Sequence, residues 1–219
     1  MRAEELKSLY RVRFGGQSEK RQKLWQTLCR GYFDRYVRPD HTVIDLGAGG
    51  CELINALRAA RRIALDPNPD TVQRAGPGVE VIAAHAHELP AALEGAADVV
   101  FASNFLEHLD SREQALEVFA AVRRALKPGG RFVVLGPNIR FAYDVYWDFF
   151  DHKIALSDRS VAEGLEASGF EIEEIRPRFL PYTTKSRLPD WPLLVRLYLK
   201  LRPLQALFGK QMLVVARRP

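Results

Sequence analysis

The feature that most constrains this chain is an apolar run that ends in a glycine-rich turn and leads into a helical pattern. The run is Thr42–Leu46, the turn is residues 47–50, and the predicted helix buries Leu53, Ile54, Leu57 and Ala60. A strand, a glycine turn and a helix form one half of a βαβ unit. The segment therefore predicts a parallel sheet, with a ligand site at the carboxyl ends of its strands.

Short apolar runs and amphipathic helical stretches alternate along the rest of the chain, which is typical of α/β folds. We expect helices at residues 20–35, at 158–168 and in a segment that starts with an Asp110/Glu113 capping box and ends before residues 127–130. Further strands are expected at residues 62–65, 79–82, 97–102, 131–135, 170–175 and 211–216. The prediction is a doubly wound, mostly parallel seven-stranded sheet with an antiparallel last strand and helices on both faces.

Length and composition favour one domain over residues 1–219. Within it we expect an N-terminal helical cap (1–40), an acceptor-side segment (136–157) and a basic, apolar insertion (179–210). The two cysteines lack metal-ligand spacing, and the chain shows neither a signal peptide nor an apolar run of about 18 residues. We therefore expect a cytoplasmic protein. The net charge of +5 fits either an anionic partner or a solvated basic surface.

Carboxylates flank the glycine turn and indicate which ligand it accepts. Asp66 ends the second strand about twenty residues after the turn, where it can accept both hydroxyls of a ribose. NAD would fit this pattern too, but Glu52 stands where a third glycine would be, and Asp45 precedes the first glycine. Both carboxylates would repel a pyrophosphate. S-adenosylmethionine has no phosphate and carries an ammonium and a sulfonium, so it matches these charges better.

Four segments resemble the motifs of class I S-adenosylmethionine-dependent methyltransferases, and the resemblance runs from about residue 43 to the C-terminus. They are residues 43–53, 63–66, 102–109 and 126–131. The resemblance implies that Asp45 and the turn glycines line the methionine moiety, that Asp66 holds the ribose, and that Ser103 and Asn104 lie near the transferable methyl. The expected cofactor contacts are Asp45, Gly47, Ala48, Gly49, Asp66, Pro67, His85, Ala86, Ser103 and Asn104.

Two positions depart from this family pattern. Cys51 replaces a frequent third glycine, and His85 stands where an acidic residue often binds the adenine amino group. A neutral imidazole can accept that hydrogen bond, or the backbone of Ala86 can read the ring. His85 and His87 also form a histidine pair, but no third ligand accompanies them on the predicted loop. We therefore expect no metal site.

The acceptor is expected beside the aromatic segment that follows the fifth strand. His152 is the leading candidate for a general base, with Asp151 orienting it or sharing the task, because histidine titrates near neutrality. Both residues could instead only hydrogen-bond the loop. His108 is a second candidate, for a catalytic, structural or cofactor-adjacent role. The expected substrate contacts are Asn138, Arg140, Tyr146 and Trp147, although helical spacing also fits core packing of the aromatic residues.

The predicted function is O-methylation of a small molecule, such as a sugar, a lipid-linked intermediate or a secondary metabolite. Residues 191–203 are apolar with only basic charges, so residues 191–208 could contact the inner membrane face, form a dimer contact or cover the pocket as a lid. We expect no nucleic-acid substrate, because no base-reading motif follows the fourth strand. A nicotinamide-dependent oxidoreductase and a non-catalytic interaction protein remain as alternatives.

Overall fold

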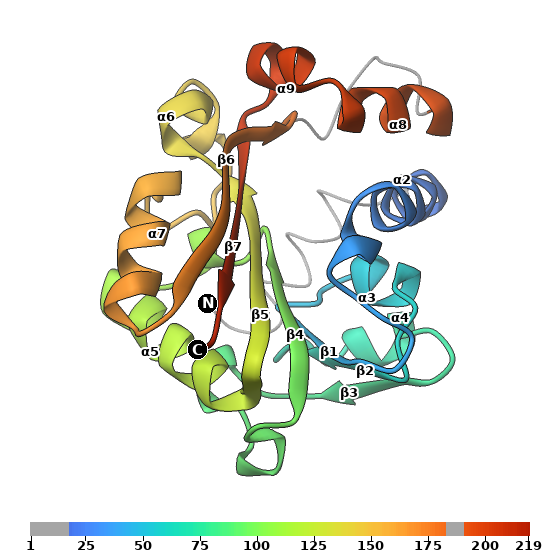
Figure 1. Cartoon of the computed structure of the whole chain (residues 1–219), viewed down its shortest axis with the longest axis vertical. Helices are drawn as coiled ribbons and strands as arrows, with labels where there is room; N and C mark the ends of the chain where they lie inside the picture. Colours follow the sequence, from blue (N-terminus) through green and yellow to red (C-terminus); the bar gives the residue numbers. More distant parts are fainter. Residues whose placement is uncertain (1–17, 183–190) are drawn as a thin grey trace.

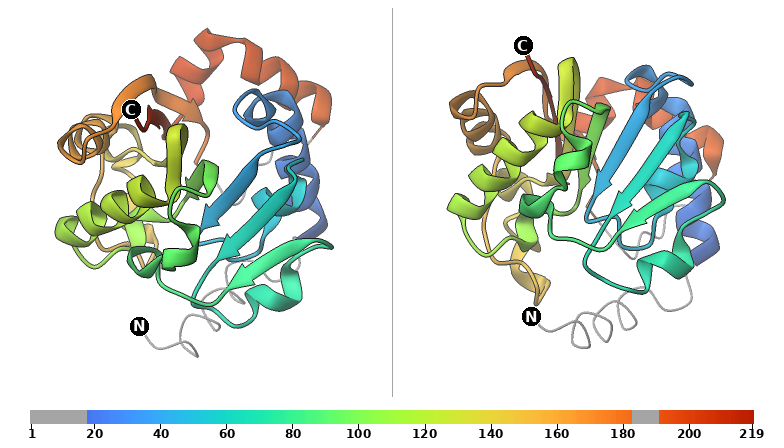
Figure 2. Two further views of the ribbon diagram at one scale, coloured as in Figure 1. Left: turned by 60° about the horizontal axis from the view of Figure 1, so that its bottom comes forward. Right: turned by 90° about the horizontal axis from the view of Figure 1, so that it is seen from below.

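A single seven-stranded sheet organises the computed structural model, which describes residues 18–182 and 191–219 (Figure 1). The strand order is β3-β2-β1-β4-β5-β7-β6. The strands are β1 (Thr42–Leu46), β2 (Arg61–Leu65), β3 (Val79–Ile82), β4 (Ala97–Ser103), β5 (Leu126–Pro137), β6 (Glu171–Leu180) and β7 (Gln211–Arg217). β1 to β5 pair in parallel, as the arrows of β1, β2 and β3 show in Figure 2, and β7 is antiparallel to both neighbours. The predicted fold is confirmed.

Helices cover both faces of the sheet because successive side chains of each strand point to opposite sides. On β1, Ile44 belongs to the core under α5 (Arg112–Ala125) and α7 (Asp158–Ala167), while Val43 belongs to the core under α2 (Ser18–Gly31) and α3 (Glu52–Ala56). The shorter helices and turns are η1 (Phe33–Arg35), α4 (Thr71–Arg74), η2 (Ala86–Glu88), η3 (Ala91–Leu93), η4 (Leu106–His108), α6 (Ile139–Ala142), η5 (Tyr146–Asp148), α8 (Pro192–Lys200) and α9 (Arg202–Phe208).

The helix after the glycine turn is shorter than its apolar spacing predicts. α3 ends at Ala56 because Leu57 adopts an extended conformation that directs the chain toward β2. Leu57 is still buried, as predicted, whereas Ala60 lies outside the helix and is exposed. The prediction for Ala60 is therefore wrong.

The N-cap of α5 is Ser111 and not Asp110. The Ser111 hydroxyl accepts a hydrogen bond from the backbone N–H of Gln114 at 3.2 Å, while the Asp110 carboxylate pairs with Lys153 on the surface. Ser111 has the extended backbone that an N-cap requires. The capping-box prediction is thus one residue out of register.

We expect Ser111→Ala to lower the free energy of unfolding by about 1 kcal/mol, because it leaves an N–H of the first turn without its side-chain acceptor. Urea denaturation measures this change. Asp110→Ala is the matched control and should cost less, because exposed ion pairs contribute little. A larger loss for the Asp110 variant would contradict the assignment of the cap.

The segment between β6 and β7 folds back onto the N-terminal helix. Leu199 of α8 is buried against α2, where a Cβ on Gly31 would lie 3.1 Å from its side chain. The hydroxyls of Tyr32 and Tyr36 donate to the Glu174 carboxylate of β6 at 2.9 and 2.6 Å. The predicted insertion and the predicted N-terminal cap thus form one layer, although residues 1–17 and 183–190 of these regions lie outside the described residues.

Within the two described ranges, no helix has both the length and the apolar character needed to cross a membrane.

Candidate functional site

The strand order reverses between β1 and β4, and doubly wound folds bind ligands at the carboxyl edge beside such a reversal. The glycine turn after β1 lies at this edge. Gly47 and Gly49 have φ of +64° and +47°, a region that favours glycine. A Cβ on Gly47 would overlap the ring of Phe105, which follows β4. The turn therefore needs glycine for its conformation and for its close approach to the neighbouring loop.

Asp66 ties the glycine turn to the end of β2. Its buried carboxylate accepts the backbone N–H of Gly49 at 2.8 Å and that of Asn68 at 2.7 Å. Burial raises the pKa of the Asp66 carboxyl, which the two amide hydrogen bonds oppose. Two carboxylate oxygens offer about four acceptor positions, so these bonds leave capacity for ligand hydroxyls.

The buried Asp45 carboxyl favours a ligand that carries positive charge. Burial raises the pKa of the Asp45 carboxyl well above its usual value, and the nearby charges of Asp66 and Glu52 raise it further. A ligand ammonium or sulfonium would offset these charges, whereas a pyrophosphate would add to them. The charge distribution of the site therefore fits S-adenosylmethionine.

The loop after β4 supplies a further polar group to the same edge. Asn104 has a left-handed backbone with φ of 49°. Its side-chain oxygen is buried and accepts no hydrogen bond from any residue that the structure describes. Such an oxygen suits a ligand donor, for example an ammonium group. Of the other expected contacts, Ala48 and Ala86 are buried, Ser103 is half-buried, and Pro67 and His85 are exposed. Their contacts with a cofactor stay predictions.

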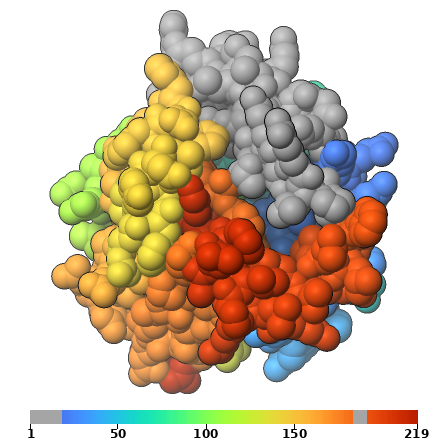
Figure 3. Space-filling model, turned by 90° about the horizontal axis from the view of Figure 1, so that it is seen from above, coloured from blue at the N-terminus to red at the C-terminus, as the bar shows by residue number. Residues whose placement is uncertain are grey.

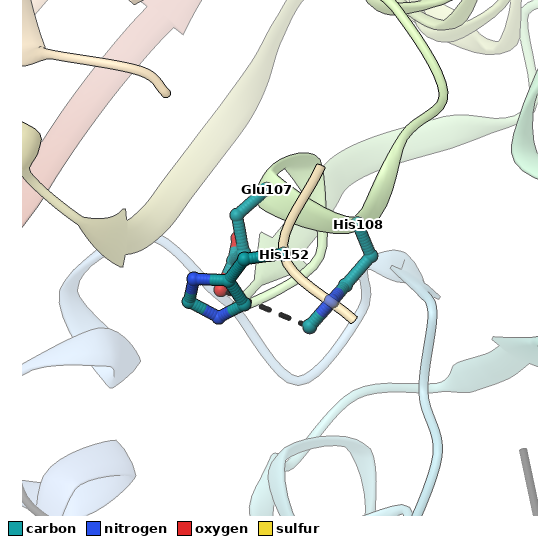
Figure 4. A group of neighbouring side chains, drawn as sticks. All are labelled: Glu107, His108 and His152. Atoms are coloured by element: carbon teal, nitrogen blue, oxygen red, sulfur yellow. Dashed lines mark ion pairs between the residues drawn. The ribbon is translucent and has the colours of Figure 1, made fainter. Parts of the chain in front are cut away.

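Glu107, His108 and His152 form a cluster beside this edge (Figure 4). The first two belong to η4, just after β4, and His152 follows β5. Nε2 of His108 lies 4.0 Å from a carboxylate oxygen of Glu107, and the two imidazole centroids are 5.1 Å apart. Glu107 and His152 are buried, and His108 is partly exposed. The sequence interpretation named both histidines as candidates and missed Glu107.

Asp151 lies beside His108. Nδ1 of His108 is 3.0 Å from the Asp151 carbonyl oxygen and 3.5 Å from its carboxylate. His152 instead stacks on Phe149, and its Nε2 lies 3.2 Å from the Tyr182 hydroxyl. The structure thus brings the three predicted catalytic residues together, with Asp151 in contact with the other histidine of the pair.

Two of the predicted substrate residues have structural contacts. Asn138 is fully buried, and its amide nitrogen donates to Asp158 at 2.7 Å while its oxygen caps α6. Arg140 binds the same Asp158 carboxylate at 2.9 Å. Both side chains hold the start of the acceptor-side segment against α7.

The two predicted aromatic residues differ in exposure. Tyr146 is fully buried and donates to the Ile154 carbonyl at 2.8 Å, so it packs inside the segment as the alternative interpretation expects. Trp147 is 56% exposed. Trp147 is therefore the one of these two that a ligand can reach without rearrangement.

Comparisons with known proteins agree with this geometry. Residues 44–134 match the family model described as a methyltransferase domain. Residues 44–134 form a methyltransferase domain. The cofactor of this domain is S-adenosylmethionine. The matched residues include the end of β1, the glycine turn, Asp66 and the Glu107–His108 pair, whereas His152 lies beyond them.

The chain is also similar to a longer protein and to proteins of known structure. The ribosomal protein L11 methyltransferase of Geobacillus kaustophilus (strain HTA426) is 30% identical over 157 residues, which cover 68% of this chain and 43% of that relative. The chain thus spans less than half the length of that relative. Two of the solved structures that resemble it share its fold over most of the chain.

The first is a methyltransferase in complex with the Haloferax volcanii Trm112 methyltransferase activator. It has a TM-score of 0.69 and 20% identity, and the match covers 94% of this chain and 96% of the other. The second is an S-adenosylmethionine-dependent methyltransferase from Archaeoglobus fulgidus. It has a TM-score of 0.63 and 18% identity, and covers 90% and 94%. At these identities the two matches establish the class I fold.

Proposed function

We propose that this methyltransferase domain methylates a hydroxyl oxygen of a small-molecule acceptor, such as a sugar, a lipid-linked intermediate or a secondary metabolite. The observation that carries the proposal is the Glu107, His108 and His152 cluster, which adjoins the expected position of the transferable methyl next to Ser103 and Asn104. S-adenosylmethionine, when bound, supplies an activated methyl group on its sulfonium. The chain must then align the acceptor oxygen and provide for the removal of the hydroxyl proton.

Each part of the site has a role in this proposal. Asp66 and the backbone of Gly49 hold the ribose side of the cofactor, and Asp45 and Asn104 receive the ammonium side. His108 and His152 engage the acceptor hydroxyl. Trp147 offers an exposed aromatic face against which a sugar or lipid ring can pack.

The acceptor-side face also carries an apolar and basic surface, which we define as residues 191–208. It comprises α8 and α9, which share one face of the molecule with the segment after β5 (Figure 3). Its exposed apolar side chains are Trp191, Leu193, Leu194, Leu197, Leu201, Leu207 and Phe208. Arg196, Lys200 and Arg202 are exposed among them. We propose that this surface contacts an anionic membrane, which suits a lipid-linked acceptor.

Thermal melts test the cofactor part of the proposal. We expect S-adenosylmethionine and S-adenosylhomocysteine to raise the melting temperature by roughly 5–10 °C at 100 times their dissociation constants, and NAD to cause no shift. A shift with NAD alone would indicate an oxidoreductase. No shift with any of the three would favour a non-catalytic role.

Transfer of a labelled methyl group tests the acceptor. The enzyme is incubated with methyl-labelled S-adenosylmethionine and either hydroxylated small molecules or purified ribosomal protein L11, the substrate named for the Geobacillus relative. We expect base-stable label in the small-molecule fraction, as an ether gives. Label in the protein alone would replace the small-molecule proposal with a protein acceptor.

Co-sedimentation with anionic and neutral vesicles tests the surface of residues 191–208. We expect binding to the anionic vesicles. Binding to neither kind of vesicle would refute the membrane contact.

A further inference from the structure

We propose that Glu107, His108 and His152 bind a divalent transition-metal cation. Each residue offers one ligand atom, and the three atoms lie within 4.8 Å of one another. Ligand atoms at about 2.0–2.2 Å from a cation are about 3–3.5 Å apart, so small side-chain rotations close the site. Two imidazoles and one carboxylate are a known ligand set for such metals. Figure 4 shows the three side chains converging from two separate segments.

The backbone holds these two segments in register. The N–H groups of Lys153 and Ile154 both point to the carbonyl oxygen of Glu107, with the Lys153 bond at 2.9 Å. β4 and β5 are neighbouring parallel strands, so η4 and the residues after β5 leave the sheet at the same edge. The geometry of the three ligands therefore depends on the sheet and does not rest on a single loop.

Hydrogen bonds to the outer nitrogens orient both imidazoles. Nδ1 of His108 donates to the Asp151 carbonyl at 3.0 Å, which leaves the Nε2 lone pair directed toward Glu107. The Asp151 carboxylate lies 3.5 Å from the same nitrogen. Nε2 of His152 lies 3.2 Å from the Tyr182 hydroxyl, a polar partner that fixes the orientation of this ring. Metal-binding histidines commonly use one nitrogen for the metal and the other for such a partner.

The buried carboxylate charge and the ligand types both favour a divalent transition-metal cation. The Glu107 carboxylate is only 2% exposed, and a cation compensates for the cost of burying its charge. Imidazole ligands suit Zn²⁺, Fe²⁺, Ni²⁺ or Cu²⁺ better than Mg²⁺ or Ca²⁺. Three protein ligands also leave a coordination position open, as catalytic metal sites do.

The role of the cation rests on the proposed function, although its binding does not. An acceptor hydroxyl at the open position would have its pKa lowered, and its proton would pass to water. The oxygen then forms its bond to the methyl carbon as the carbon–sulfur bond breaks, and that electron pair stays on sulfur. In this arrangement His108 and His152 act on the acceptor hydroxyl through the cation, and His152 is not the general base, because a coordinated nitrogen cannot also accept the proton.

Metal titration of the whole chain tests the proposal. Protein freed of metal with a chelator is titrated with Co²⁺, Zn²⁺ and Mg²⁺ by calorimetry, and the Co²⁺ complex is recorded by absorption. We expect one Co²⁺ or Zn²⁺ per chain, with Mg²⁺ binding far more weakly. His108→Asn and Glu107→Gln should each raise the dissociation constant at least about 100-fold, since even outer-sphere partners contribute 10–100-fold.

The control is His87→Gln, which changes the other histidine pair and should leave metal affinity unchanged. The melting shift caused by S-adenosylhomocysteine should persist in every variant, which shows that each is folded and keeps its cofactor site. Metal binding that is equally weak in wild type and Glu107→Gln, or lost equally in His87→Gln, would overturn the proposal. Metal binding without any methyl transfer would leave the site in place and refute the proposed function.

Discussion

Asp66→Ala is expected to weaken S-adenosylmethionine binding at least about 100-fold, equivalent to about 2.8 kcal/mol. The variant removes the acceptor expected for the ribose hydroxyls. It also releases the N–H groups of Gly49 and Asn68, which the carboxylate holds at 2.8 and 2.7 Å. The glycine turn then loses its connection to β2, so binding falls for two separate reasons. Calorimetric titration with S-adenosylmethionine measures the change.

Two further variants separate these reasons. Asp66→Asn keeps one acceptor oxygen and should bind with intermediate affinity. Glu80→Ala removes an exposed carboxylate of β3 that pairs with Arg61, and its affinity should equal that of the wild type. Undiminished binding by a folded Asp66→Ala variant would show that the cofactor does not contact the end of β2.

Asp45→Asn is expected to stabilise the protein without cofactor and to weaken cofactor binding. Burial and the charges of Asp66 and Glu52 raise the pKa of Asp45, so the folded state holds a proton that the unfolded chain releases. The stability contribution of Asp45 therefore falls as pH rises from the unfolded pKa through the raised folded pKa. Asparagine removes this pH dependence. The melting temperature of the variant should exceed that of the wild type by roughly 2–4 °C for each 1 kcal/mol gained in the free energy of unfolding. The difference should be larger at pH 8 than at pH 4.

The same variant should show a smaller melting shift with S-adenosylmethionine, because asparagine has no proton to release and cannot become the negative partner of the ligand ammonium. Melts at several pH values, with and without the ligand, measure both effects. Asp98→Asn is the matched control, since Asp98 is partly exposed and pairs with Lys127 at the opposite end of the strands. A loss of stability at neutral pH in Asp45→Asn, or an undiminished ligand shift, would refute this account.

The placement of the expected cofactor residues at one sheet edge could be predicted from sequence because their signals are local. Each residue follows a strand within one or two positions, and parallel strands bring their carboxyl ends to one edge. Gly47, Asp66 and Asn104 therefore lie where the motif order places them. The contact of Asp66 with the Gly49 amide was beyond prediction, because it depends on the exact path of the turn.

The acceptor half could be predicted only in part because its contacts are long-range. Asn138 and Arg140 resemble ligand-binding residues in sequence, yet both are committed to Asp158, some twenty residues away. The same limit explains why Glu107 was missed. A signal existed, because Glu107–His108 follows β4 and Asp151–His152 lies on the segment after its neighbour β5. Two dipeptides, each an acidic residue followed by histidine, lie after adjacent strands, and this pattern could have indicated the cluster.

The contact between the N-terminal helix and the α8 segment affects how the chain can fold during synthesis. α2 lies against Leu199, and its following turn is held by Glu174, so residues near the start need partners more than 130 positions later. The parallel strands β1 to β5 can pair before those partners leave the ribosome, but α2 cannot be covered until they do. Contacts so distant in sequence slow folding, and uncovered apolar surface attracts chaperones. We therefore expect this layer to close last, once β6 and α8 have left the ribosome.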